Sequence, residues 1–179
     1  MTARLFLRLL LAAALLIAGC ASALRAPEVR YEPTPHDVVR TMLELAAPRA
    51  GELVADLGCG DGRIVIEAVQ RHGARGLCVD IDPRRIAEAR RNAEQAGVAA
   101  RITFLEQDLF SVDLREVNVL MLFLSPAFNL KLRPKLEREL ARGARVVSHW
   151  HDMGDWQADQ SVQMPSDGRL RPIYLWIIR

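Results

Sequence analysis

A glycine-rich run that carries two carboxylates of its own follows a short apolar segment. The run spans residues 56–62, reads DLGCGDG, and comes directly after the apolar residues 53–55. Glycines permit a tight turn and let a ligand approach the backbone closely. A helix that begins at once after the turn leaves free backbone amides pointing at that ligand. The run therefore indicates a small-molecule binding loop between a strand and a helix.

The spacing within this run separates one class of ligand from another. A dinucleotide site is typified by G-x-G-x-x-G, with a helix N-terminus aimed at a pyrophosphate. Here the spacing is G-x-G-x-G, preceded by Asp56 and interrupted by Asp61. Two carboxylates would repel a pyrophosphate, but they suit a ligand that carries an ammonium and a sulfonium. We therefore expect S-adenosyl-L-methionine as the cofactor, bound at the turn by Asp56, Gly58, Cys59, Gly60 and Gly62.

Two further aspartates follow the next two expected strands. Asp80 ends the second strand, where it can accept both ribose hydroxyls, as the acidic residue does in dinucleotide folds. Asp108 follows the third strand, where it can accept from the adenine amino group. Each of them, taken singly, is better explained by a helix cap or a solvated loop, and Asp82 is expected to cap the next helix. Acidic groups at three successive strand ends nevertheless predict one continuous cofactor site.

The elements that position these residues alternate between short apolar runs and helical patterns. Such alternation predicts an α/β, Rossmann-like, doubly wound and mostly parallel seven-stranded sheet with helices on both faces. The last stretch has no helix and predicts a C-terminal antiparallel hairpin around residues 166–168. The expected strands are 53–57, 76–81, 102–105, 117–124, 144–149, 160–164 and 172–178, and the expected helices are 35–47, 64–71, 83–96 and 129–141, the last interrupted or restarted at Pro134. Thr34 is expected to cap the first helix with its hydroxyl, and Pro35 to occupy its first position.

Length and charge limit the classes of partner. The chain has 179 residues, half of them hydrophobic and 26% charged, which fits one globular domain with a sizeable core. Its net charge is +2, and 22 basic and 22 acidic residues remain once Arg4 and Arg8 are set aside with the N-terminal segment. Nucleic-acid binding usually requires a basic excess or patch. We therefore expect no nucleic-acid partner, and we expect the protein to be a monomer.

The N-terminal segment has the features of an export signal. Arg4 and Arg8 precede and flank an apolar run over 9–18 that is too short to span a bilayer. Basic, apolar and small residues in this order are typical of a secretory signal peptide. The tetrapeptide 17–20, IAGC, is similar to a bacterial lipobox, in which the cysteine is lipidated. The alternatives are an uncleaved signal anchor, or a start site assigned upstream of a cytosolic protein.

These features predict three parts of the chain. Residues 1–20 form a lipoprotein-type signal with Cys20 as the lipidated residue, 21–33 form a tether, and 34–179 form the cofactor-binding domain. The domain would then be exported or associated with a membrane through its N-terminal segment. Cys59 and Cys78 lack neighbours that would complete a metal site, so they are expected to be small buried residues, with neither a disulfide nor a metal.

The cofactor motifs resemble those of the class I, seven-β-strand S-adenosylmethionine-dependent methyltransferases. A narrower resemblance joins the chain to the small archaeal and mitochondrial-type non-SET protein lysine methyltransferases and their bacterial relatives. It rests on YEPTP at 31–35, DGRIVI at 61–66, KLEREL at 135–140, and GARVVS at 143–148 followed by Trp156. The resemblance implies that Tyr31 and Thr34 help to close the cofactor pocket, and that the loop 124–126 faces the methyl acceptor.

The acceptor side carries less information. Many amino-group methyltransferases that act on DNA or glutamine have Asn/Asp-Pro-Pro-Tyr/Phe after the fourth strand, whereas this chain has FLSP at 123–126. That departure argues against those acceptors without identifying lysine. An apolar or aromatic channel would lower the pKa of a lysine amine and favour its neutral form. The expected channel residues are Tyr31, Phe123, Ser125, Trp150 and Trp156, although both tryptophans could instead pack the sheet edge.

Three functions remain open at this point. The acceptor is a protein lysine, or it is a small molecule, or the chain is a membrane-tethered module that binds S-adenosylmethionine without turnover. The third has a physical motive, because the cofactor is made in the cytosol and an exported protein would not meet it. The intact acidic set argues against a decayed pocket. His149 and His151 flank Trp150, and either could relay a proton, although such histidines are more often structural.

Overall fold

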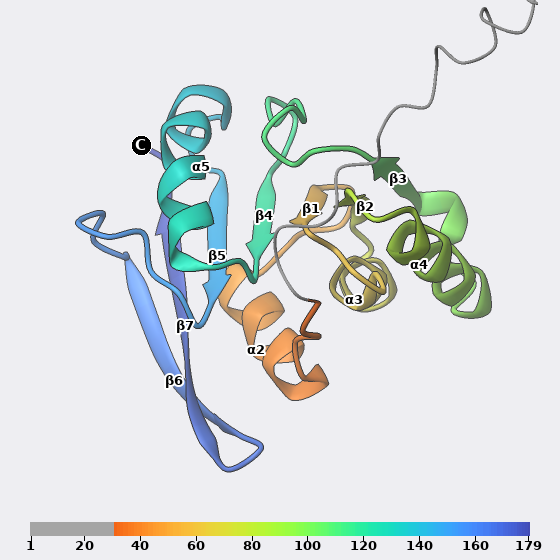
Figure 1. Cartoon of the computed structure of the whole chain (residues 1–179), viewed down its shortest axis with the longest axis horizontal. Helices are drawn as coiled ribbons and strands as arrows, with labels where there is room; N and C mark the ends of the chain where they lie inside the picture. Colours follow the sequence, from red (N-terminus) through yellow and green to blue (C-terminus); the bar gives the residue numbers. More distant parts are fainter. Residues whose placement is uncertain (1–30) are drawn as a thin grey trace, which may run out of the picture.

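The computed structural model describes residues 31–179, which form one seven-stranded sheet with helices on both faces (Figure 1). The strands are β1 (Leu53–Leu57), β2 (Arg75–Asp80), β3 (Ile102–Glu106), β4 (Val119–Leu122), β5 (Arg145–His149), β6 (Gln160–Ser166) and β7 (Arg169–Ile177). The helices are α2 (His36–Ala46), α3 (Arg63–His72), α4 (Pro83–Gln95) and α5 (Pro126–Glu139), with a short 3₁₀ turn, η1 (Ala99–Arg101).

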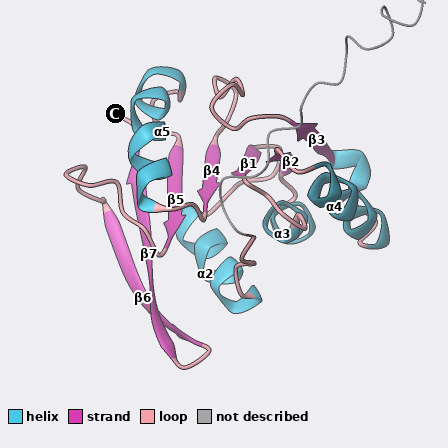
Figure 2. Ribbon diagram, in the orientation of Figure 1, coloured by secondary structure: helices cyan, strands magenta, loops and turns pink. Residues whose placement is uncertain are grey.

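The strand order is β3-β2-β1-β4-β5-β7-β6. Strands β3 to β5 pair in parallel, whereas β7 runs antiparallel to both β5 and β6. The expected doubly wound sheet with a closing C-terminal hairpin is therefore confirmed (Figure 2). Because β1 to β5 run parallel to one another, their carboxyl ends meet along one edge, where ligands bind in folds of this kind.

The two faces of the sheet bury separate apolar clusters, because successive side chains of a strand point to opposite faces. Val54 of β1 and Met121 of β4 pack with residues of α2 and α3. Leu57 and Leu122 of the same strands pack with residues of α5 on the other face. Both central strands are buried on both sides, which explains why they contain few polar residues. Asp56, in β1, is a buried exception.

The beginning of α2 differs from the expectation. The helix begins at His36, and Pro35 precedes it as the capping residue without a side-chain hydrogen bond. Thr34 is buried, and its carbonyl accepts a hydrogen bond of 2.9 Å from Nη1 of Arg63. The predicted Thr34 hydroxyl cap was therefore wrong, because Arg63 holds Thr34 outside the helix and against the glycine-rich turn.

Helix α5 also differs, because it continues through Pro134 without a break. A proline removes the hydrogen bond to the carbonyl four residues earlier, here that of Leu130. Leu130 is exposed, so this position lies on the outer side of the helix. The expected signal, Cys20 and most of the expected tether lie outside the described residues. No helix within residues 31–179 is long and apolar enough to cross a membrane.

Candidate functional site

The glycine-rich turn joins β1 to α3 and folds back onto β2. The backbone amides of Gly58 and Cys59 both donate to the carbonyl of Val79, at 2.8 and 3.0 Å. At Gly60, φ is +55° and a Cβ would collide with the ring of Tyr31. Glycine is therefore required at this position, both for the left-handed backbone and because Tyr31 packs directly on the turn.

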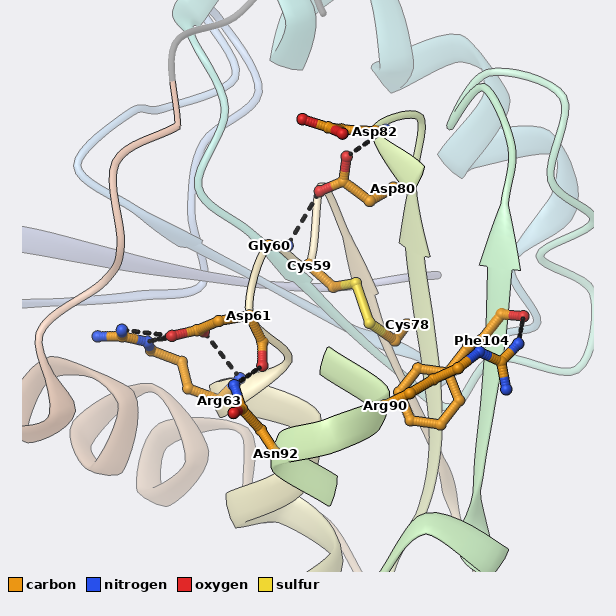
Figure 3. Close-up of a disulfide and its surroundings, with 10 residues drawn as sticks. All are labelled: Cys59, Gly60, Asp61, Arg63, Cys78, Asp80, Asp82, Arg90, Asn92 and Phe104. Carbon is orange, nitrogen blue, oxygen red and sulfur yellow. Dashed lines mark hydrogen bonds and ion pairs between the residues drawn. A yellow bond between two sulfur atoms is a disulfide. The ribbon is translucent and has the colours of Figure 1, made fainter. Parts of the chain in front are cut away.

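A disulfide joins the same turn to β2 (Figure 3). Cys59 and Cys78 are bonded, with their Cα atoms 5.3 Å apart, so the expectation of two unpaired cysteines was wrong. The reason is tertiary, because parallel pairing sets Leu57 opposite Val79 and the turn then brings Cys59 back beside Cys78. Their separation of 19 residues carries no such signal. Residues 31–179 contain no cluster of three side chains suited to a metal ion.

Asp80 lies at the centre of the turn's hydrogen bonds (Figure 3). One carboxylate oxygen accepts from the amide of Gly60 at 3.0 Å, and the other accepts from the amide of Asp82 at 2.9 Å. Each oxygen still has a free lone pair for a ligand hydroxyl. Asp82 caps α4 by accepting from the amide of Arg84, as predicted. Asp108 accepts from the amide of Phe110 at 2.9 Å.

Two neighbouring cavities open at this edge of the sheet. The larger has a volume of about 960 Å³, at the upper end of the usual range for small-ligand sites. Asp80 and Asp108 line one part of it, and Phe123, Ser125 and Trp150 line another. The smaller, of about 30 Å³, has room for a group the size of one water molecule. It is lined by Tyr31, Thr34, Asp56, Gly58, Cys59 and Gly60, among others, and the residues that line both cavities are Tyr31, Glu32, Gly58 and Phe123.

Asp56 is a buried carboxyl group in the wall of the smaller cavity. Burial, with the nearby charges of Asp80 and Asp61, raises the pKa of Asp56 from its ordinary 3.8 to about 8. Burial would raise the pKa of Asp61 as well, but the hydrogen bonds and charge of Arg63 outweigh burial and lower it. Among residues 31–179 no cation offsets the burial of this carboxyl, so it fits an ammonium, which would restore its charged form. The residues present therefore fit the methionyl end of S-adenosylmethionine.

This raised pKa predicts an unusual dependence of stability on pH. From about pH 4 to about pH 8 the folded protein retains a proton on Asp56 that the unfolded chain has lost, so this group destabilises the fold increasingly as the pH rises. We expect Asp56→Asn to stabilise the protein, with a gain that grows by up to about 1.4 kcal/mol per pH unit and levels off above about pH 8. This gain is measured by denaturant unfolding of the wild type and the variant, without ligand, near pH 5 and near pH 9.

Asp61→Asn is the matched control, because the pKa of Asp61 is lowered and its charge is paired. It should lose the stability that its ion pair with Arg63 provides across this pH range, and this loss is partly offset because its charge no longer opposes the ionisation of Asp56. An equal gain for Asp56→Asn at both pH values would contradict the assignment. In calorimetry, S-adenosylmethionine binding to the wild type should release a proton at neutral pH, whereas binding to Asp56→Asn should not.

The structure divides the expected acceptor residues. Tyr31, Ser125 and Trp150 line the large cavity, as does Phe123. Trp156 lines neither cavity. Its ring lies 5.8 Å from that of Trp176, and its carbonyl accepts from the indole of Trp176 at 2.8 Å. The sequence left open whether the two tryptophans line a channel or pack the sheet edge. Trp156 therefore packs, whereas Trp150 lines the cavity.

The two histidines that flank Trp150 also differ in whether they line the cavity. His149 is fully buried, and its ring lies 4.2 Å from that of Phe123. Burial, together with the charges of Arg171 and His151, lowers the pKa of His149 to about 4, so it is neutral at physiological pH. It lines neither cavity, whereas His151 lines the large one. Burial also lowers the pKa of His151.

Asn129 holds the loop that carries Trp150 and His151, and sequence reasoning missed it. This buried residue of α5 donates from Nδ2 to Oγ of Ser148 at 3.1 Å and to the carbonyls of His151 and Asp152, at 3.1 and 3.2 Å. The hydroxyl of Ser148 donates to the carbonyl of His151 as well, at 2.6 Å. An asparagine inside a helical pattern offers no local sign of such a role.

We expect Asn129→Leu to lower the free energy of unfolding by about 2 kcal/mol, because it leaves buried polar groups without a donor. Loosening the loop should lower the turnover number while the dissociation constant of S-adenosylmethionine stays within about twofold. Denaturant unfolding and calorimetry measure the two quantities. A marked loss of cofactor affinity would show that Asn129 supports the whole edge of the sheet rather than this loop.

Comparison with known proteins identifies the family. The ANTKMT methyltransferase domain matches residues 56–160, which is more than half of the chain. A protein-lysine N-methyltransferase of Saccharolobus islandicus is 40% identical over 153 residues, covering 85% of this chain and 95% of that protein. The adenine nucleotide translocase lysine N-methyltransferase of Mus musculus is 38% identical over 130 residues, covering 73% of this chain and 56% of the mouse protein. This chain thus spans about half of the mouse relative.

A solved structure agrees with the fold. An RNA methyltransferase from Salinibacter ruber, in complex with S-adenosyl-L-homocysteine, superposes with a TM-score of 0.79 at 46% sequence identity. The match covers 82% of this chain and 94% of that one. The bound product of that complex agrees with the ligand that the acidic residues and the two cavities fit here. The chain belongs to the ANTKMT methyltransferase domain family, and it is a class I S-adenosylmethionine-dependent methyltransferase.

Proposed function

We propose that this protein transfers a methyl group from S-adenosylmethionine to the side-chain amine of a lysine in a protein acceptor. The observation that supports it most is the archaeal relative, which is named a protein-lysine N-methyltransferase and is matched over 95% of its length. A second support is the aromatic wall of Phe123 and Trp150 at the acceptor end of the large cavity. Aromatic faces hold the cationic form of an amine, and an apolar environment favours its neutral form.

Each cofactor residue has a role that its geometry allows. S-adenosylmethionine supplies an electrophilic methyl group on a sulfonium when it is bound. Asp56 faces the small cavity and accepts from an ammonium there. Asp80 keeps a free lone pair on each oxygen for the two ribose hydroxyls, and Asp108 accepts from the adenine amino group. Tyr31 and Thr34 close this side by packing on the turn.

On the acceptor side, the residues prepare the amine. Phe123 and Trp150 exclude water and hold the lysine side chain in line with the methyl group, and such positioning supplies most of the rate of a displacement. His151 lines the cavity, and burial lowers its pKa, which favours the neutral imidazole. It can therefore accept the proton that the lysine amine must lose, directly or through water.

One observation favours a second acceptor. The structure from Salinibacter ruber is named an RNA methyltransferase, and it is 46% identical to this chain. The near balance of basic and acidic residues in this chain weighs against RNA, because phosphate-binding surfaces need a basic excess. RNA is therefore the alternative that the decisive experiment must separate from protein.

The experiment incubates the purified protein with methyl-labelled S-adenosylmethionine and a cell extract. We expect label in material that protease digests and nuclease does not, and methyllysine after acid hydrolysis of that material. Asp80→Ala, which removes a cofactor contact, is the control and should give no label. Label released by nuclease would establish RNA as the acceptor, and label in metabolites would establish a small molecule. Cofactor binding without any label would establish a binding module.

We propose further that the protein is exported through a lipoprotein-type signal and is lipidated at Cys20. The disulfide between Cys59 and Cys78 supports this location, because disulfides persist mainly in oxidising compartments. Mass spectrometry of the protein from membrane fractions should find a mature chain that begins with a lipid-modified Cys20, and Cys20→Ser should release the protein from the membrane. An unmodified full-length chain in the cytosolic fraction would overturn this location.

A further inference from the structure

Arg171 is a buried cation at the acceptor end of the large cavity. It belongs to β7, lines the cavity and is 7% exposed. Its Nε atom is buried without a hydrogen-bond partner among residues 31–179. Its ion pair with Asp167 is long, at 3.5 Å, and the side chain of Asp167 is 71% exposed. A buried guanidinium with an unused donor is costly, so it points to a partner that arrives with a ligand.

The fold holds this guanidinium in place. Its central carbon lies 5.3 Å from the centre of the Trp150 ring. Trp150 has a φ of +72°, a conformation that is strained for a bulky residue, and its amide donates to the carbonyl of Pro172 at 2.7 Å. Such strain persists only where the surroundings impose it, and it gathers at functional sites. This hydrogen bond, from the residue after β5 to β7, thus sets both the ring and the cation at the cavity wall.

Charge is distributed unevenly along the cavity. Asp80 ends β2, and Asp82 and Asp108 follow β2 and β3, on one side of the sheet centre. Arg169 and Arg171 begin β7, on the other side. The remaining charged side chains of the lining are Glu32, Arg84, Arg85 and Lys131. Of these, Arg84 pairs with Asp82, Arg85 pairs with Glu88, and Lys131 lies 4.2 Å from the centre of the Phe110 ring.

We propose that Arg171, assisted by Arg169, binds the carboxylate of an acidic residue that flanks the target lysine in the acceptor protein, and so determines which lysines are methylated. This inference rests on the proposed lysine acceptor. A guanidinium binds a carboxylate through two parallel hydrogen bonds, which gives direction as well as energy. The same positive charge repels a second basic residue beside the target. The acceptor class is therefore a lysine segment that contains Glu or Asp near the target and no cluster of basic residues.

A flanking carboxylate explains the observations better than a phosphate chain. Nucleic acid is usually bound through a groove in which several cations follow successive phosphates. Here one arginine, Arg171, is nine-tenths buried in the cavity wall, and its Nε is unpaired. The basic and acidic residues of the chain are nearly balanced in number. One enclosed guanidinium suits one carboxylate, whose contacts are made only when the acceptor is in place.

The test uses the full chain, saturating S-adenosylmethionine and a set of synthetic lysine peptides. In matched pairs, each position around the lysine carries Glu in one peptide and Gln in the other. We expect the wild type to prefer Glu at one or two positions by about tenfold or more in kcat/KM, expressed mainly in KM. In Arg171→Gln the preference should disappear, in Arg171→Lys it should be partly retained, and in the control Arg142→Gln it should be unchanged. Calorimetry with S-adenosylmethionine verifies that each variant is folded.

The outcomes separate this inference from the proposed function. If the wild type methylates lysine peptides but the rates are equal within every Glu and Gln pair, the inference is overturned and the proposed function stands. This outcome can be measured with the wild type, without any variant. A preference that survives in folded Arg171→Gln would also overturn it. Labelling of RNA in place of any lysine peptide would overturn the proposed function and the inference together. If Arg171→Gln does not fold, the wild type and Arg171→Lys still decide the outcome, because only a bidentate contact predicts a preference that Lys weakens.

Discussion

Asp80→Ala is expected to weaken the binding of S-adenosylmethionine by about 100-fold or more. Two contributions add in this variant. The carboxylate loses its hydrogen bonds to the ribose hydroxyls, and hydrogen bonds to a charged group contribute about 1.5–3 kcal/mol each. It also loses the bonds from the amides of Gly60 and Asp82, which hold the turn in position. Isothermal titration calorimetry at fixed pH measures the change.

Asp82→Ala is the matched control for this prediction. Asp82 is the neighbouring carboxylate of the same loop, but it caps α4 and pairs with Arg84. Its loss should lower the stability of the protein by about 1 kcal/mol and change cofactor affinity far less. Asp80→Asn should fall between the two, since an amide oxygen can still accept one of the bonds. Undiminished binding in Asp80→Ala would remove Asp80 from the site.

Reduction of the disulfide between Cys59 and Cys78 is expected to lower the free energy of unfolding by about 3 kcal/mol. The bond joins two cysteines that are separated by 19 positions in the sequence, and it thereby restricts the unfolded chain. It also ties the glycine-rich turn to β2, beside the hydrogen bond from Gly60 to Asp80. Affinity for S-adenosylmethionine should therefore fall together with stability.

Denaturant unfolding of the oxidised and the reduced wild type isolates the cross-link, because both forms have the same sequence. The double variant Cys59→Ala, Cys78→Ala is the control, and reducing agent should have no effect on it. Both cysteines are buried, so reduction must be verified by counting free thiols under denaturing conditions. Equal stability of the fully reduced and oxidised wild type would contradict the prediction.

Local patterns determined most of the fold. The alternation of strands and helices depends on the periodicity of apolar residues, and every predicted strand and helix is present, with ends shifted by a few residues. The sequence also predicted the glycine-rich turn, because the glycine spacing and the nearby aspartates that define it lie within one short segment. Asp80 and Asp108 could be placed because the carboxyl ends of parallel strands meet at one edge of a sheet. S-adenosylmethionine as the ligand therefore followed from residues whose roles are set locally.

Only the tertiary structure decided which distant residues meet. Strand register brings Cys59 to Cys78. Arg63, at the start of α3, donates to the carbonyl of Thr34 and holds Thr34 outside the helix that it was expected to cap. The direction of a side chain after β5 sets Trp150 in the cavity, whereas Trp156 packs against Trp176. The antiparallel return of β7 buries Arg171 in the wall of the large cavity. Composition and spacing do not encode these contacts, because each depends on how separated segments pack and on the space left between them.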